Sequence, residues 1–265
     1  MISTIPKQLI KILVVLMALM MVMDTQSLCA TKKKKKKIKV KNTVVEKKIV
    51  IPTKNVVPVV ILPPPVPVAV EKPSLVLDDF EDGNYTQNPE WWKFDRLFLS
   101  VVQNTSEEKS ASAFLANYSL LIEGSSSNWY VGGFGTYIGK DFSPYDAIQL
   151  VVWGSGPGSG MLKMELYDDD NANWEVDVDK AKGFDATSDD KFSNTMEVNW
   201  TGWKVVTIPL YDFEDENLNV GDDKWNPDQQ NGSGGLLQMQ VIVLTSGKAV
   251  GKVNVKVDSI KFIKR

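Results

Sequence analysis

Apolar and polar residues alternate with a period of two in several stretches of the second half of the chain. This period predicts β-strands, because successive side chains of a strand point to opposite faces of the sheet. The stretches cover residues 147–153, 161–167, 203–210, 236–244 and 253–263. None of them has the 3.6-residue period of an amphipathic helix over three turns, so the pattern predicts an all-β domain.

Turn-forming residues separate these stretches. Residues 154–160 read Gly-Ser-Gly-Pro-Gly-Ser-Gly, which predicts a hairpin or another loop between two strands. Pro209 lacks a backbone N–H, so its strand is expected to lie at a sheet edge or to end there. Short strands separated by glycine-rich turns predict a β-sandwich.

Carboxylates lie on both terminal strands of this domain. Residues 75–77 are apolar and lead into Asp78-Asp79-Phe80-Glu81-Asp82, which a Gly-Asn turn signal follows. The closing stretch carries Asp258 in the middle of its alternation. The ends of the sandwich are therefore expected to meet around a metal ion or a buried polar pair.

Residues 1–30 have the pattern of a secretory signal peptide. Two lysines precede an apolar run at 12–23, and Leu28-Cys29-Ala30 offers a cleavage site. The run is short for a membrane span. Lipid attachment at Cys29 and an uncleaved N-terminal anchor are the alternatives, and each of the three predicts export to an extracellular, periplasmic or cell-surface location.

Residues 31–74 are predicted to be a linker between the signal and the domain. Six consecutive lysines open it, and prolines recur through the rest of it. Charge repulsion and polyproline-like stiffness both extend such a chain. The valine-rich run at 56–62 leaves a short strand or a partner-binding segment as the alternative to a plain tether.

Missing residue types exclude several kinds of chemistry. The chain has no histidine, which excludes Ser-His-Asp and Cys-His catalysis and histidine-ligated zinc. Its single cysteine lies before the domain, so the domain is expected to have no disulfide. Residues 73–265 carry 16 basic and 30 acidic residues, a balance that disfavours nucleic acid as a partner.

Eight tryptophans are the most informative positive feature of the composition. A flat indole matches the apolar C–H face of a pyranose ring, and Asp, Asn, Gln and Glu pair with the sugar hydroxyls. Tryptophans also fill sandwich cores. We expect Trp203 and one of Trp91 and Trp92 to be buried.

Four motifs in one order resemble the family 11 carbohydrate-binding modules and their galactose-binding-like relatives. They are Leu77–Glu81, Trp129–Gly133, Trp203–Leu210 and Val257–Ile260, and the resemblance extends over residues 75–265. It implies a jelly-roll β-sandwich that binds a polysaccharide of the β-glucan type and does not cleave it.

The resemblance also implies site residues. The carbohydrate-binding residues are expected to be Trp129, Tyr130, Asp168, Asp170 and Trp174. The cleft arginine and tyrosine that the family carries after the strand at 203–210 have no clear counterpart in residues 213–225, and Val243-Leu244 stand where it has another tyrosine. The glycan is therefore expected to differ from the family's mixed-linkage β-glucan, or the binding to be weak.

A structural Ca²⁺ ion is implied at Glu81 and Asp258, with Asp79 as a third ligand, where it would hold the two terminal strands together. The run Asp168-Asp169-Asp170-Asn171 is only superficially like a calcium loop, because it lacks the glycine and the distal glutamate of an EF-hand. There we expect a solvated acidic loop or contacts to sugar.

The sequence thus predicts an exported, monomeric, non-catalytic carbohydrate-binding protein, with membrane contact only through an N-terminal anchor. A structural or adhesion protein of the cell envelope, using the same jelly roll to bind protein, is the alternative. A glycosidase is a third hypothesis, and it requires two carboxylates in one cleft about 5–10 Å apart.

Overall fold

The computed structural model describes residues 71–179 and 185–265 of the 265-residue chain. The predicted signal peptide and Cys29 lie outside the described residues, as does the predicted linker up to residue 70. Within the described part, no helix is long and apolar enough to cross a membrane.

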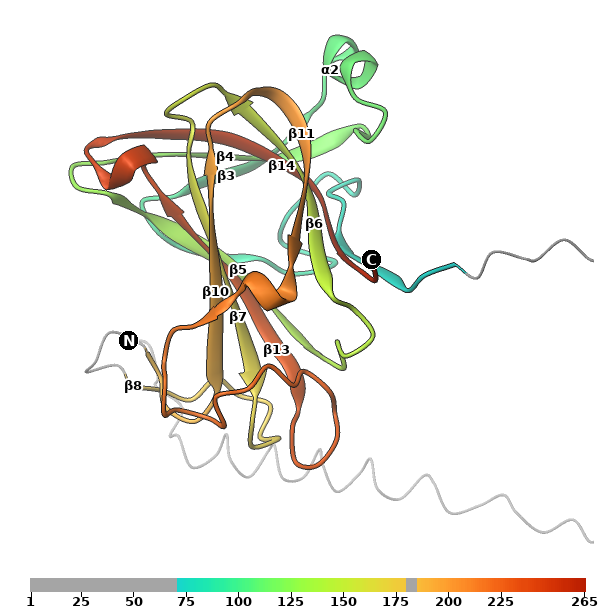
Figure 1. Cartoon of the computed structure of the whole chain (residues 1–265). Helices are drawn as coiled ribbons and strands as arrows, with labels where there is room; N and C mark the ends of the chain where they lie inside the picture. The colour runs from blue at the N-terminus through green and yellow to red at the C-terminus, as the bar shows by residue number, and fades with distance from the viewer. Residues whose placement is uncertain (1–70, 180–184) are drawn as a thin grey trace, which may run out of the picture. The chain divides into compact units, whose positions relative to one another are not determined.

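Two antiparallel sheets form the described domain (Figure 1). The first sheet contains, in spatial order, β11 (Thr201–Pro209), β6 (Ala147–Ser155), β14 (Gly251–Ile263), β4 (Tyr118–Ser126) and β3 (Phe98–Gln103), and β1 (Ser74–Asp78) also pairs with β14. The second sheet contains β12 (Glu214–Asp215), β10 (Asp190–Val198), β7 (Gly160–Asp169), β13 (Gly235–Leu244), β5 (Tyr130–Lys140) and β2 (Trp92–Asp95). A short ribbon of β8 (Val178–Asp179) and β9 (Asp185–Ala186) stands apart from both sheets.

The strand order is that of a jelly roll. The central strands are arranged β4-β14-β6-β11 in one sheet and β5-β13-β7-β10 in the other. Along the chain, β4, β5, β6 and β7 alternate between the two sheets, and β13 and β14 do the same. Eight strands in two such sets make the double Greek key of a jelly roll, which confirms the predicted fold class.

The inward faces of the two sheets enclose one hydrophobic core. Large side chains with almost no exposed surface fill it, among them Phe80, Trp91, Phe134, Phe142 and Phe262. On the central strands, core residues alternate with residues that point outward, as in the buried Met239, Val241 and Val243 of β13. This alternation is the one that the sequence shows, and it leaves the outer face of the second sheet free for polar and aromatic side chains.

The glycine-rich segment 154–160 connects the two sheets and does not close a hairpin. β6 lies in the first sheet and β7 in the second, so the chain crosses the sandwich here. Its outermost glycine, Gly158, has a φ of +92° and open space around its Cβ position, as expected of a loop tip. A short helix, α2 (Ser106–Ala111), also departs from the all-strand pattern, and a capping box between Thr105 and Glu108 begins it.

The terminal strands meet as expected. β1 pairs antiparallel with β14. At the end of β1, buried Asp78 accepts hydrogen bonds from the Trp91 indole nitrogen and the Phe80 backbone nitrogen, each over 2.7 Å. Trp91 is thus the buried member of the pair with Trp92, whereas Trp203 is only half-buried, so the expectation for Trp203 was wrong. Trp203 lies on β11, which forms the edge of its sheet and ends at Pro209.

Candidate functional site

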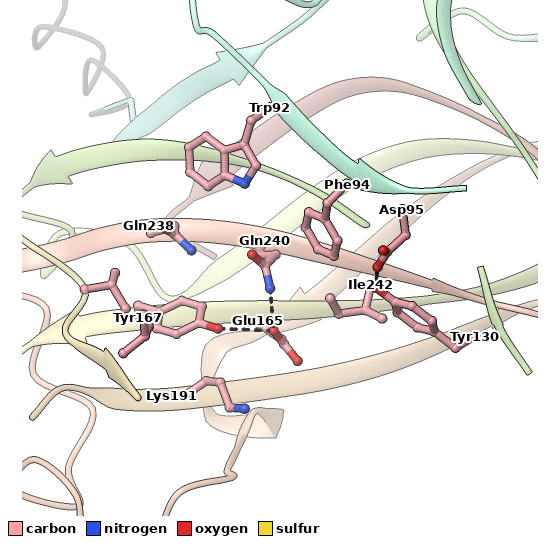
Figure 2. A pocket seen from close by; sticks show the side chains of 12 residues that line it. Trp92, Phe94, Asp95, Tyr130, Glu165, Tyr167, Lys191, Gln238, Gln240 and Ile242 are labelled. Carbon is pink, nitrogen blue, oxygen red and sulfur yellow. Dashed lines mark hydrogen bonds between the residues drawn. The ribbon is translucent and has the colours of Figure 1, made fainter. Parts of the chain in front are cut away.

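An open cleft of about 850 Å³ lies on the outer face of the second sheet. Aromatic and polar side chains from β2, β5, β7, β10 and β13 line it, together with two valines from residues 176–178. The lining residues are Trp92, Phe94, Asp95, Tyr130, Glu165, Tyr167, Val176, Val178, Lys191, Gln238, Gln240 and Ile242. Figure 2 shows the rings of Trp92 and Phe94 on one side of the cleft and Tyr167 with Lys191 on the other.

One wall of the cleft is built by aromatic side chains opposite glycines. In the pairing of β2 with β5, Trp92 lies opposite Gly135 and Phe94 opposite Gly133. A Cβ atom at Gly135 would lie 2.8 Å from the Trp92 ring, and one at Gly133 would lie 2.3 Å from the Phe94 ring. The two rings therefore lie directly over the β5 backbone, where only glycine leaves room for them.

The floor of the cleft carries a chain of hydrogen bonds around Glu165. This carboxylate accepts hydrogen bonds from the Gln240 amide at 3.0 Å and the Tyr167 hydroxyl at 3.4 Å (Figure 2). It also forms an ion pair with Lys163 at 2.8 Å. Amide, hydroxyl and carboxylate groups are thus held at fixed positions next to the aromatic wall, which is the mixture that a sugar hydroxyl can pair with.

The cleft continues toward Trp129 along the same face. A smaller hollow contains Trp129 and shares Tyr130, Glu165 and Ile242 with the main cleft. The Tyr130 hydroxyl donates a hydrogen bond to Asp95, and burial together with that contact raises the pKa of Tyr130. The Trp129 ring lies edge-on to the Tyr130 ring, with 6.0 Å between centroids.

The predicted carbohydrate-binding residues fall into three places. Tyr130 lines the main cleft and Trp129 lines the hollow beside it. Trp174 is 45% exposed on the loop after β7, and its backbone nitrogen donates to Asp169. Asp168 and Asp170 do not line the cleft, because they lie where β7 ends.

Asp168 and Asp170 belong to an acidic cluster where β7 ends and β10 begins. Burial, followed by the charges of neighbouring aspartates, raises the pKa of Asp168 to about 8 and that of Asp170 to about 7. Asp170 accepts a hydrogen bond from the backbone nitrogen of Asp190 at 2.9 Å, and Asp168 accepts one from Asn226 at 2.8 Å. Nothing in this arrangement presents either carboxylate to the aromatic wall.

The three residues predicted to hold calcium share one corner of the domain. Asp258 is buried, and burial followed by the charges of Glu81 and Asp79 raises its pKa to about 7. Glu81 already accepts three hydrogen bonds, from the backbone nitrogens of Asn117 and Tyr118 and from the Asn117 amide. Three hydrogen bonds leave about one of the four lone-pair sites of the Glu81 carboxylate for an ion, and calcium at this corner stays a prediction.

No protein-family model matches the sequence, and no curated protein matches it either.

Several solved structures of carbohydrate-binding modules are similar to the chain at low identity. A family 11 module from Clostridium thermocellum, in complex with a β-1,3-1,4-mixed-linked tetrasaccharide, is 13% identical over 72% of this chain and 95% of its own, with a TM-score of 0.44. The family 11 module of the cellulosomal cellulase Lic26A-Cel5E of the same organism is 12% identical over 74% and 97%, with a TM-score of 0.45. The CBM22-2 xylan-binding domain of Paenibacillus barcinonensis Xyn10C is 18% identical over 71% and 97%, with a TM-score of 0.37. The similarity is one of fold, and it assigns no ligand to this chain.

Sequence reasoning missed most residues of the cleft. Trp92 and Phe94 alternate with polar residues in a strand of only four residues, which was too short to stand out. Gly133 and Gly135 are the sequence feature that could have indicated the aromatic wall. Two glycines at alternate positions leave one face of a strand without side chains, so rings from a neighbouring strand can lie over it. Gln240 points outward between buried residues of β13 and could have been found from that alternation.

Proposed function

We propose that this domain is a carbohydrate-binding module that holds a polysaccharide chain in the cleft of the second sheet without cleaving it. The observation that carries the proposal is the pairing of an aromatic wall, Trp92 and Phe94, with the hydrogen-bonding floor at Glu165 and Gln240. Sugar rings would stack on the wall through their C–H faces, and their hydroxyls would pair with the floor.

The shape of the groove supports a chain ligand rather than a single sugar. Its β13 floor runs from Gln238 to Leu244, which at about 3.4 Å per residue gives a length of roughly 20 Å. The wall is fixed before the ligand arrives, because the two rings already lie over β5. Such preorganisation reduces the entropy lost on binding.

Binding without cleavage is supported by the state of the carboxylates in the cleft. A glycosidase needs one carboxylic acid that can donate a proton and a second carboxylate across the sugar. Glu165 is ion-paired with Lys163 and accepts two hydrogen bonds, so it serves as an acceptor. Asp95 accepts a hydrogen bond from the Tyr130 hydroxyl, which holds this carboxylate in place.

The polysaccharide that we propose as the ligand is a β-glucan, because the sequence motifs resemble those of family 11 modules. Export, a monomeric state and a structural calcium ion at Glu81, Asp258 and Asp79 accompany it as predictions from the sequence.

Affinity electrophoresis of the full-length chain through gels containing soluble polysaccharides would test the proposal. We expect retardation by a β-glucan, and loss of that retardation in Phe94→Ala. Phe98→Ala is the matched control, since Phe98 is an exposed aromatic residue on β3 of the first sheet, and it should be retarded like the wild type. Absence of retardation by β-glucans, xylans and galactans would refute the proposal and favour a protein-binding role in the cell envelope.

A further inference from the structure

Aspartates from three separate segments converge at the end of the second sheet where β7 ends and β10 begins. Carboxylate oxygens of Asp170, Asp190 and Asp222 lie within 4.8 Å of one another. Asp170 directly follows β7, Asp190 begins β10, and Asp222 lies on the loop between β12 and β13. Asp190 also belongs to a second such group with Asp215 and Asp223.

The cluster contains buried oxygens that no hydrogen-bond donor satisfies. Asp190 is completely buried, and its Oδ1 atom has no hydrogen-bond partner. The same is true of Asp168 Oδ1 nearby. A buried carboxylate oxygen without a partner is unfavourable, and its presence calls for an unseen proton, water or cation.

The free oxygen of Asp190 points into the space between the three segments. A Cβ atom at Gly221 would lie 2.3 Å from Asp190 Oδ1 and 2.2 Å from Asp170 Oδ2. Both oxygens therefore approach one point beside the Gly221 backbone. The φ of Gly221 is +74°, a conformation that glycine adopts at no steric cost, so this residue lets the loop approach the two carboxylates.

We propose that Asp170, Asp190 and Asp222 bind a calcium ion that ties together the end of β7, the start of β10 and the loop before β13. All three ligands are hard oxygens, which favours Ca²⁺ or Mg²⁺ over the softer transition metals. Two oxygens that share a Ca²⁺ ion at about 2.4 Å lie at most about 4.8 Å apart, and the oxygens of the three carboxylates lie within this limit. Nearby Asp168, Asp215 and Asp223 add negative charge around the ion.

The cluster is accessible, and the residues that the structure describes give it little compensating positive charge. Asp222 has a side chain that is 41% exposed, which gives an ion a path to the buried Asp190. Among the described residues, the one ion pair recorded for these three ligands joins Asp222 to Lys224 over 3.1 Å. The backbone nitrogen of Lys224 also donates to Asp190 and Asp222, which brings these two carboxylates together.

Thermal unfolding of the full-length chain in EDTA and in saturating Ca²⁺ would test the site, with calorimetric titration of Ca²⁺ alongside. We expect calcium to raise the Tm of the wild type by about 5 °C or more. Asp170→Asn and Asp190→Asn should abolish this shift. In EDTA, Asp190→Asn should be at least as stable as the wild type, because it removes a buried charge from a cluster of like charges.

Two further variants locate the ion. Asp141→Asn removes an exposed carboxylate outside the cluster and should keep the full calcium shift. Asp258→Asn removes a ligand of the other predicted calcium site and should also leave the shift from the acidic cluster in place. A wild type without any calcium shift would overturn the proposal. A shift that survives in both Asp170→Asn and Asp190→Asn but disappears in Asp258→Asn would overturn it as well.

Discussion

Replacing Gly133 by alanine should displace the Phe94 ring and destabilise the sandwich. The new Cβ atom would lie 2.3 Å from the tip of the Phe94 ring, whereas carbon atoms in contact are ordinarily about 3.5–4.0 Å apart. The ring must therefore move by more than about 1 Å. The same Cβ would lie 2.9 Å from the Val241 carbonyl oxygen, which belongs to the sheet backbone and cannot move independently.

Overpacking of this kind costs about 1–3 kcal/mol. For a domain of this size, each kcal/mol lowers the Tm by roughly 2–4 °C, so Gly133→Ala should unfold roughly 2–12 °C below the wild type. It should also bind polysaccharide more weakly, because the wall of the cleft has shifted.

Thermal unfolding followed by circular dichroism would measure the difference. Gly251→Ala is the matched control, because a Cβ atom there meets nothing nearer than 3.5 Å and the residue has no positive φ. If Gly133→Ala unfolded at the same temperature as Gly251→Ala and bound polysaccharide like the wild type, the proposed stacking of Phe94 over β5 would be refuted.

Three further predictions concern the corner around Asp78 and the short helix. Trp91→Phe removes the indole donor to buried Asp78 and should lower the unfolding free energy by about 1–3 kcal/mol in urea titrations; an unchanged value would contradict this. Burial raises the pKa of Asp78 to about 6, so the contribution of this group to stability is greatest below about pH 4 and is lost as the pH rises through 6. The difference between the unfolding free energies of wild type and Asp78→Asn should therefore change between pH 4 and 7. Parallel pH curves of the two proteins would disprove the raised pKa of Asp78. Thr105→Ala breaks the capping box and should lower the local stability of α2 by about 1 kcal/mol, which hydrogen exchange would detect as faster exchange of its backbone amides. Exchange as slow as in the wild type would argue against the cap.

The fold could be predicted from sequence because most of its strands alternate strongly. The expected closing strand at 253–263 lies within β14, and the stretch at 147–153 lies within β6. The partners of each strand could not be predicted so directly. Residues 154–160 have the composition of a hairpin turn, yet they connect strands of different sheets, because pairing depends on the whole arrangement rather than on the turn.

The candidate site was predictable only where its residues follow one another in sequence. Trp129 and Tyr130 were identified from a local motif, and the structure places both along the groove. The convergence of Asp170, Asp190 and Asp222 could not be predicted from sequence, because they lie on three separate segments that only the folded chain brings together. The run at 168–171 does not by itself form a calcium loop, because the other candidate ligands lie 20 and 52 residues beyond Asp170.

The most direct test of the proposed function is calorimetric titration of the full-length chain, and of Trp92→Ala, with a soluble β-glucan oligosaccharide. Truncating a central aromatic anchor costs about 2 kcal/mol or more, so we predict saturable binding by the wild type and affinity at least about 30-fold lower in Trp92→Ala. Equal affinities of the two proteins would contradict the claim that the cleft of the second sheet holds the sugar. Absence of binding by the wild type would contradict this claim as well.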